Sequence, residues 1–527
     1  MVNTSDLLQL PLWRPEAYVE DASPAERIAL SYERARSVAR LDRSDLAAVL
    51  KELESFDAVG EFMLTEVGHG LDARHIETTA TEMDDGSFDL HTPNIKAAKS
   101  MPPATPYAKM PHRRRVTSRL LPSRPGAKVI DHAITSFTHV RLEASALLGS
   151  LDAPENERKD FFSHIHRVSV GTLSLSMVHI PIIRLSAYIL GRYSQRRCVT
   201  GPDPGQQIPV VYFSTQNTPI LTALTCASVF DAYATTTITG FMEAESPQIR
   251  SSLATIFKQT ITHSVKALYP EMIDRCGWQG LYNHNQLQEL ALTMQGNSVA
   301  EGDILVLCIK MVSEVFLGRY DLPKTQDPRS LLAQHEMGIW QESGELAMAA
   351  MIKEGSNRND EFNKILLPRV RKLVLATGQR AAYEAAAASE KVTPAMLKLF
   401  EATCLLDDAS WYVENKKVTS AELYSRHADA VAELLPSLET LLQDSGASPW
   451  ATAPILREDS WIEFIERLPT FGHEDTSRNI KDAAVSQSTD GSSVSDIESK
   501  KVGSKIRKRT LSRLVNLMCP TLSFSRG

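Results

Sequence analysis

The feature that most constrains the fold is a change of sequence pattern near residue 60 and again near residue 150. Residues 24–57 are rich in Ala, Glu, Arg and Leu, which favour a helix. From Gly60 to Leu148 apolar and β-branched residues alternate between Gly, Asp and Pro, as in short strands, with an acidic turn at residues 84–86. Long runs with one apolar face return after residue 156. This order predicts an α+β fold, with a β layer set into a mostly helical chain.

The helical part divides into separate runs. Helices are expected at 158–198, 217–242, 246–275 and 300–319, and again through 328–470, where Thr393 is expected to cap a helix that begins at Pro394. Beyond residue 475 the chain is rich in Ser, Asp, Lys and Gly without apolar periodicity, which predicts disorder. A chain of 527 residues exceeds one core. The predicted domains are a helical segment (1–59), a middle β domain (60–150), a helical domain (151–325), a C-terminal helical domain (326–472) and a tail (473–527).

Charge and cysteine content exclude several classes of protein. A net charge of −7 gives no support for nucleic-acid binding, which depends on neutralising phosphates. Six cysteines without a CxxC pair argue against a disulfide framework and a structural zinc site, and no metal is expected. The N-terminus lacks the features of a signal peptide, and the apolar run 168–183 is too short to span a membrane. The basic stretch 500–513 is expected to be a solvated tail, with a membrane-surface element as the alternative.

A glycine-rich segment begins the β region. Residues 68–73 match the dinucleotide fingerprint G-x-G-x-x-A, but that fingerprint requires a helix immediately afterwards. Residues 74–81 favour a strand instead, so the dinucleotide interpretation is disfavoured. A tight turn at Gly68 and Gly70, which lets the backbone approach a ligand, is the preferred interpretation.

A single carboxylate interrupts an apolar stretch far downstream. Glu301 lies between Ala300 and Gly302, and Val299, Ala300, Ile304 and Leu305 predict apolar surroundings that suit a general base. Asp303 is expected to cap the following helix. The alternative is that Glu301 is a solvent-facing glutamate at the start of that helix.

Together these motifs resemble the acyl-CoA oxidases of the acyl-CoA dehydrogenase superfamily. The similar segments are 65–70 (TEVGHG), 77–81 (ETTAT), 91–93 (HTP), 117–122 (TSRLLP), 139–141 (HVR), 193–197 (YSQRR), 209–216, 276–277 (CG) and 300–303 (AEGD). They cover most of residues 58–320 and, more loosely, the helices to about residue 470.

The resemblance implies a fold and a cofactor. It implies a small β-barrel-like middle domain, a four-helix-bundle flavin domain and bound FAD in a homodimer. Thr65 and Gly68 would then face the flavin ring. Arg196 and Gln216 would reach the pyrophosphate and adenine side of FAD across the dimer interface. Arginine suits a pyrophosphate because its planar guanidinium donates two parallel hydrogen bonds to phosphate oxygens. Gly277 would belong to a glycine-rich loop near the adenine.

The resemblance also implies a reaction. Glu301 would take the α-proton of an acyl-CoA while hydride leaves the β-carbon for the flavin, giving a trans-2-enoyl-CoA. The backbone N–H of the glutamate and a flavin hydroxyl would polarise the thioester carbonyl. The C-terminal helices favour an oxidase, with a dehydrogenase as the alternative. Similarity to filamentous-fungal relatives suggests secondary metabolism. Location is expected to be peroxisomal by resemblance or cytoplasmic, because residues 525–527 are not a peroxisomal address.

The chain departs from this family in two places. Only 64 residues precede the TEVGHG motif, where the family has a substantial helical domain. Residues 108–115 replace several family strands, and Pro102-Pro103 stands where many relatives have glycines. These departures leave a second hypothesis open, a catalytically impaired truncated paralogue that acts as a non-catalytic partner.

Overall fold

The computed structural model describes residues 10–14, 26, 29–30, 33–34, 63–70, 72–101, 115–122, 124–126, 132–147, 151–157, 160–161, 165, 167–354 and 360–470. The chain divides into two compact units, Met1–Ile462 and Glu463–Gly527. The functional groups described below belong to the first unit. Most of the predicted helix 24–57, Pro102-Pro103, most of the segment 108–115 and the predicted tail lie outside the described residues.

The β region forms two small antiparallel sheets. Its strands are β1 (Thr79–Glu82), β2 (Phe88–His91), β3 (Lys99–Met101), β4 (Val116–Leu120), β5 (Ala133–Phe137) and β6 (Val140–Leu142). The sheets have the orders β1-β2-β6 and β3-β5-β4. The expected turn at residues 84–86 joins β1 to β2, with Gly86 at φ +77°. Thr92 and Phe137 connect the two sheets, since the Thr92 N–H donates to the Phe137 carbonyl at 2.8 Å.

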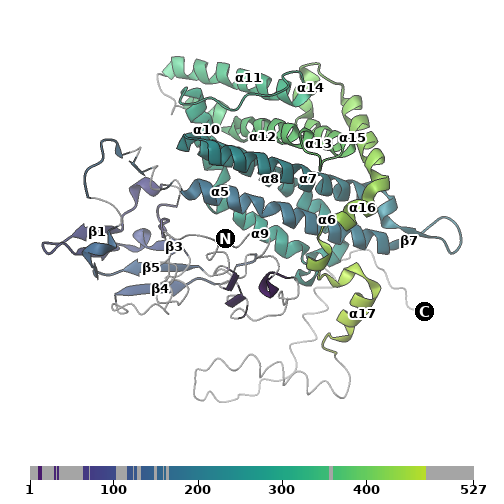
Figure 1. The fold of residues 1–527 in the computed structure, drawn as a ribbon, viewed down its shortest axis with the longest axis horizontal. Helices are drawn as coiled ribbons and strands as arrows, with labels where there is room; N and C mark the ends of the chain where they lie inside the picture. Colours follow the sequence, from purple (N-terminus) through teal and green to yellow (C-terminus); the bar gives the residue numbers. More distant parts are fainter. Residues whose placement is uncertain are drawn as a thin grey trace, which may run out of the picture. The chain divides into compact units, whose positions relative to one another are not determined.

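Helices make up most of the described chain, which confirms the predicted α+β class (Figure 1). They are α5 (Arg167–Met177), α6 (His179–Arg196), α7 (Ser214–Glu243), α8 (Pro247–Asp274), α9 (Leu287–Val299), α10 (Ile304–Phe316), α11 (Leu331–Glu354), α12 (Val370–Ala387), α13 (Pro394–Asp407), α14 (Ala409–Glu414), α15 (Ser420–Leu434), α16 (Leu438–Asp444) and α17 (Glu458–Glu466). A hairpin of β7 (Cys198–Thr200) and β8 (Gln207–Pro209) separates α6 from α7.

The hydrophobic core is centred on α7 and α8. These helices pack against each other, with α5 and α6 on one side and α12 on the other, as Figure 1 shows. Phe230, Phe257 and Ile261 are fully buried where they meet. Side chains of this size stabilise a fold by roughly 1.5–3 kcal/mol each on burial. The long central helices therefore form a well-packed support for the loops at their ends.

Local signals at helix starts are confirmed. Thr393 caps α13, because its hydroxyl accepts a hydrogen bond from the Met396 N–H at 3.3 Å and Pro394 is the first helical residue. Thr419 and Glu422 form a capping box at α15. These short-range patterns are independent of the rest of the fold.

One helical stretch has the length and composition of a membrane span. It is Arg167–Arg196, which covers α5 and α6, but 61% of its most apolar window is buried against other helices. Core helices of globular proteins have the same character, so this stretch is weak evidence for a membrane.

Five cysteines lie within the described residues, and all five are free thiols. Cys226, Cys276, Cys308 and Cys404 are buried. Burial raises the pKa of Cys226, Cys276 and Cys308 to about 12 and raises the pKa of Cys404 well above its usual value. Cys198 is only half-buried.

Candidate functional site

Glu301 occupies a strained turn between α9 and α10. Its φ is +52°, and Gly302 follows at φ +90°. A residue with a Cβ adopts positive φ rarely, and the surroundings must hold it there. Asp303 caps α10 as predicted, because its carboxylate accepts from the Leu305 and Val306 N–H groups at 3.0 and 3.3 Å.

The carboxylate of Glu301 lies directly against α5. A Cβ added at Gly171 would stand 2.4 Å from Oε2, so a larger residue would displace the carboxylate from this position. The other oxygen, Oε1, is 3.4 Å from Nη2 of Arg167, on the first turn of the same helix. The Glu301 side chain is 27% exposed, so it is held in place and still accessible.

The immediate neighbours enclose the carboxylate less than the sequence predicts. Ile304 is buried, but Val299 and Leu305 are 55% and 44% exposed. The expected apolar surroundings are therefore incomplete in the described part of the chain. The two exposed side chains belong to helix ends, where α9 stops and α10 begins.

Three consecutive carbonyl groups of this turn accept hydrogen bonds from neighbouring helices. The Lys258 ammonium on α8 donates to the carbonyls of Ala300 and Gly302, both at 2.7 Å. The Thr172 hydroxyl on α5 lies 2.6 Å from the Glu301 carbonyl and 2.7 Å from the Val168 carbonyl of its own helix, so its single hydrogen is shared between the two acceptors. None of Lys258, Thr172 and Gly171 is predicted from the sequence. A lone lysine in the otherwise uncharged run 251–262 was the one available signal.

A second group of predicted residues comes together at the end of α6. The Gln216 amide nitrogen donates to the Ser194 hydroxyl at 2.8 Å and to the Arg275 carbonyl at 3.0 Å. This amide thus joins the last turn of α6, which carries Arg196, to the turn before Gly277. Gln216 is buried and uses both amide hydrogens internally, so it holds the group together rather than presenting donors outward.

The other members of this group face the surface. Gly277 has φ +58°, with open space where a side chain would be, so a ligand can approach its backbone. Tyr212 and Trp278 are both 72% exposed and offer flat aromatic faces. The Arg196 guanidinium donates to the Ile455 carbonyl at 3.2 Å and forms an ion pair with Glu458.

Thr65 and Gly68 lie in the loop that precedes the first sheet. The Thr65 carbonyl accepts from the Ser100 N–H at 2.9 Å, and the Thr65 side chain is half-buried. The Gly68 N–H donates to the Lys96 carbonyl at 2.8 Å, and a Cβ at Gly68 would stand 2.8 Å from the Lys96 Cβ. The predicted tight turn is confirmed. A 3-10 turn and then β1 follow it, without the helix that a dinucleotide fingerprint requires.

Glu66 fixes this loop from within. Its carboxylate accepts from the N–H groups of Glu77 and Thr78 at 2.8 and 3.0 Å and from the Lys99 ammonium at 3.0 Å. Burial alone would raise its pKa, but these donors outweigh burial and lower the Glu66 pKa to about 2. Glu66 lies beside Thr65, but no sequence pattern marks it as the residue that holds this loop.

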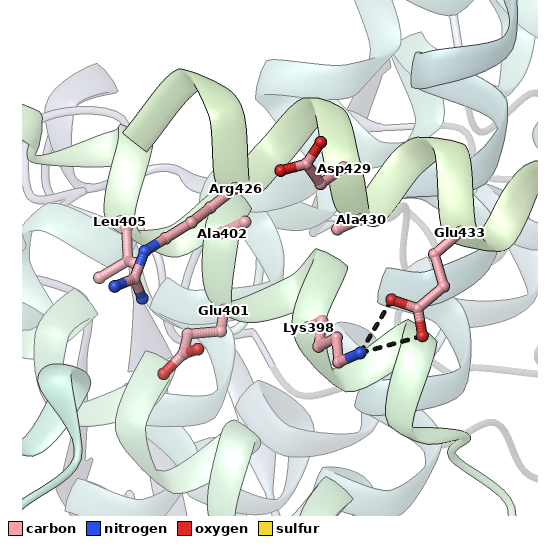
Figure 2. A pocket seen from close by; sticks show the side chains of 8 residues that line it. All are labelled: Lys398, Glu401, Ala402, Leu405, Arg426, Asp429, Ala430 and Glu433. Carbon is pink, nitrogen blue, oxygen red and sulfur yellow. Dashed lines mark hydrogen bonds and ion pairs between the residues drawn. The ribbon is translucent and has the colours of Figure 1, made fainter. Parts of the chain in front are cut away.

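The predicted site residues therefore form three groups in the structure. Arg196, Gln216 and Gly277 are together, whereas the Thr65–Gly68 loop and Glu301 share no direct contact with them among the described residues. The donor set fits a flavin nucleotide, because it combines a guanidinium, exposed aromatic rings and a backbone open to approach. A cavity of about 260 Å³ lies elsewhere, between α13 and α15 (Figure 2), and none of the predicted residues lines it.

Solved structures show which class of fold this is. An acyl-CoA oxidase 3 from Yarrowia lipolytica has a TM-score of 0.70 at 14% identity, over 94% of this chain and 92% of that one. Acyl-CoA oxidase-2 of Caenorhabditis elegans, bound with FAD, ascaroside-CoA and ATP, has a TM-score of 0.69 at 14% identity, over 86% and 81%. The chain has the fold of the acyl-CoA oxidases, as the resemblance predicts.

The chain is also similar in sequence to two curated acyl-coenzyme A oxidases. The chain is 29% identical to the acyl-coenzyme A oxidase acox-3 of Caenorhabditis elegans over 229 residues, which is 34% of each chain. It is 24% identical to human peroxisomal acyl-coenzyme A oxidase 3 over 326 residues, 51% of this chain and 46% of the relative. The matches thus span between a third and a half of the length of these relatives. No protein-family model matches the chain.

Proposed function

We propose that this protein is an FAD-dependent acyl-CoA oxidase that converts an acyl-CoA to its trans-2-enoyl-CoA, with Glu301 as the base. The observation that carries the proposal is the geometry of one residue. Glu301 presents a partly exposed carboxylate, seated on Gly171, from a turn whose three carbonyls are all held by other helices. Its own N–H has no hydrogen bond within the described part of the chain. A base and a backbone donor are thus offered at one place.

These two groups match what the reaction needs. The carboxylate removes the α-proton, whose bonding electrons form the new C2–C3 double bond as hydride leaves the β-carbon. FAD, when bound, supplies the hydride acceptor. The free N–H of Glu301 is suited to donate to the thioester carbonyl and so stabilise the charge that develops there. Arg167, 3.4 Å from Oε1, keeps the carboxylate in position against α5.

For the cofactor we propose the two remaining groups of residues. Arg196 supplies a cation for the pyrophosphate, and Gly277 supplies an open backbone. Gln216 fixes the positions of the two segments that carry them through its hydrogen bonds to Ser194 and Arg275. Thr65 and Gly68 present the loop beside the first sheet to the flavin ring. The C. elegans structure that is bound with FAD supports this choice of cofactor, because it shares the fold.

The first test compares wild type with Glu301→Gln. The wild type is expected to purify with FAD and to lose the oxidised flavin absorbance anaerobically with one of a set of short, medium and long saturated acyl-CoAs. Glu301→Gln should retain FAD while flavin reduction falls by about two to four orders of magnitude, because the amide cannot accept the proton. Reduction at the wild-type rate in this variant would refute the base assignment.

The same preparation distinguishes the finer assignments. Hydrogen peroxide formed in air identifies an oxidase, whereas flavin reduced only in the presence of an electron carrier identifies a dehydrogenase. Protein that binds neither FAD nor acyl-CoA is the outcome expected of a non-catalytic partner. We propose a homodimer, to be checked by light scattering, and a peroxisomal location, which the name of the human relative supports. A role in fungal secondary metabolism rests on sequence resemblance alone.

A further inference from the structure

The charge of Lys258 is placed where a charge is costly. Lys258 is fully buried in the middle of α8, and no carboxylate lies within ion-pair distance of it in the described residues. Burial lowers the pKa of its ammonium to about 8. If Lys258 only filled space, an apolar residue of similar size would give a more stable protein. The two contacts it makes, both to carbonyls beside Glu301, are therefore the place to look for its role.

Those contacts set the direction of a donor. In a trans peptide the C=O of one residue and the N–H of the next point in opposite directions. The Ala300 carbonyl points to Lys258 at 2.7 Å, so the N–H of Glu301 must point away from α8. The Thr172 contact with the Glu301 carbonyl likewise directs the Gly302 N–H away from α5. Holding the carbonyls inward leaves the amide hydrogens on the opposite side of the turn.

We infer that Lys258, assisted by Thr172, is a positioning residue that holds the Glu301 turn at positive φ and aims the Glu301 N–H at the substrate carbonyl. This inference rests on the proposed function for the substrate, but the hold on the turn does not. The cost of a buried ammonium and of a strained glutamate is thereby explained by one arrangement. Neither Lys258 nor Thr172 touches the substrate itself.

The central experiment removes the donors without removing bulk. Lys258→Met and Thr172→Val are each expected to lower the rate constant of anaerobic flavin reduction roughly tenfold or more at saturating acyl-CoA, since a misdirected backbone donor stabilises less charge. The apparent dissociation constant for acyl-CoA should change little. Thr172→Ser restores the hydroxyl and should restore the rate. Thr255→Val is the matched control, because the Thr255 hydroxyl donates only to the Ser251 carbonyl on its own helix.

A spectroscopic measurement distinguishes a change in the direction of the Glu301 N–H from a general loss of stability. In the Glu301→Gln background, which blocks turnover, acyl-CoA labelled with ¹³C at the thioester carbonyl should show a lowered carbonyl stretching frequency when bound. Adding Lys258→Met should remove at least half of that shift. Tm is expected to stay near that of the wild type, because the lost hydrogen bonds are offset by removal of a buried charge. An unchanged reduction rate and carbonyl frequency in Lys258→Met and Thr172→Val would overturn the inference.

Hydrogen exchange tests the hold on the turn even if the proposed function fails. The N–H groups of Leu305 and Val306 are bonded to Asp303, directly after the turn. Their exchange should become roughly tenfold faster in Lys258→Met than in wild type and stay unchanged in Thr255→Val. If wild type holds no flavin, faster exchange still supports the positioning role while the proposed function falls. Equal exchange in wild type and Lys258→Met would overturn the positioning role on its own.

Discussion

At the scale of single residues, the seat of the Glu301 carboxylate depends on a missing side chain. Gly171 lies within α5, where glycine weakens a helix by roughly 0.5–1 kcal/mol relative to alanine. The structure gives a packing reason for a glycine at this position. The carboxylate fills the space that a methyl group would take.

Gly171→Ala should therefore separate activity from stability. The added Cβ would stand 2.4 Å from Oε2 and must displace the carboxylate, so flavin reduction should fall about a hundredfold. The free energy of unfolding should not fall by a comparable amount, because alanine favours α5. Stopped-flow reduction and denaturant unfolding measure the two effects. Gly240→Ala is the control, since its Cβ would meet only Leu253 at an ordinary 3.6 Å. Equal reduction rates in both variants would contradict the assigned seat.

Residue by residue, short-range signals were readable and long-range partners were not. Asp303 and Thr393 cap helices because of residues two or three positions away, so the sequence was sufficient to predict both. Glu301 was identified by its motif. Its partners Lys258 and Thr172 are brought to it across 43 and 129 positions of sequence, respectively. Only Lys258 carries a local signal, as the one charge in the run 251–262, and that signal does not indicate its partner.

At the scale of elements, Glu66 ties its own loop to strand β3 and to the residues that precede β1. Its carboxylate joins the residues before β1 to Lys99 on β3 and is itself fully buried. The folded-state pKa of about 2 lies below the ordinary value of 4.5. The stabilisation is thus complete above pH 4.5 and is lost as the pH falls towards 2.

Unfolding measured at several pH values tests this. At neutral pH Glu66→Gln should reduce the free energy of unfolding by about 3 kcal/mol, and the difference from wild type should shrink as the pH falls below about 4.5. Urea titrations across that range follow both proteins. The same pH dependence in wild type and Glu66→Gln would rule out the assigned role of Glu66.

Elements with strong periodicity were predicted closely. The expected runs 217–242 and 246–275 correspond to α7 (Ser214–Glu243) and α8 (Pro247–Asp274). α9 (Leu287–Val299) was missed, because Gln, Asn and Gly interrupt its apolar pattern. The β region was predicted as a whole, but its division into two sheets was not. That division depends on pairings such as β2 with β6, which lie far apart in the chain.

At the scale of the whole first unit, the C-terminal segment is fastened to the end of the helical bundle. The Gln286 amide donates to the Trp450 carbonyl at 3.1 Å and accepts from the Thr452 N–H at 2.9 Å. Farther along, the Ile455 carbonyl and Glu458 contact Arg196. The segment that follows α16 thus forms a hydrogen bond and an ion pair with the Arg196 guanidinium, which is the group proposed to bind the cofactor pyrophosphate.

Glu458→Gln should therefore tighten FAD binding. The Glu458 side chain is 69% exposed, so its ion pair is weak, and its loss should improve the FAD dissociation constant by up to about fivefold. Quenching of flavin fluorescence on titration measures the constant. Glu439→Gln is the control, because Glu439 pairs with Arg192 instead. Equal or weaker FAD binding by Glu458→Gln would show that Arg196 does not serve the cofactor.

The buried cysteines affect how fast the protein would be inactivated by oxidation. An oxidase releases an oxidant with every turnover, and peroxide attacks the thiolate rather than the thiol. Cys226, Cys276 and Cys308 remain protonated at neutral pH because burial raises the pKa of each to about 12. If the protein is the oxidase proposed above, these three thiols would therefore resist the peroxide that it releases. Among the described cysteines, damage would begin at half-buried Cys198, two residues from Arg196, so self-inflicted oxidation would first impair cofactor retention.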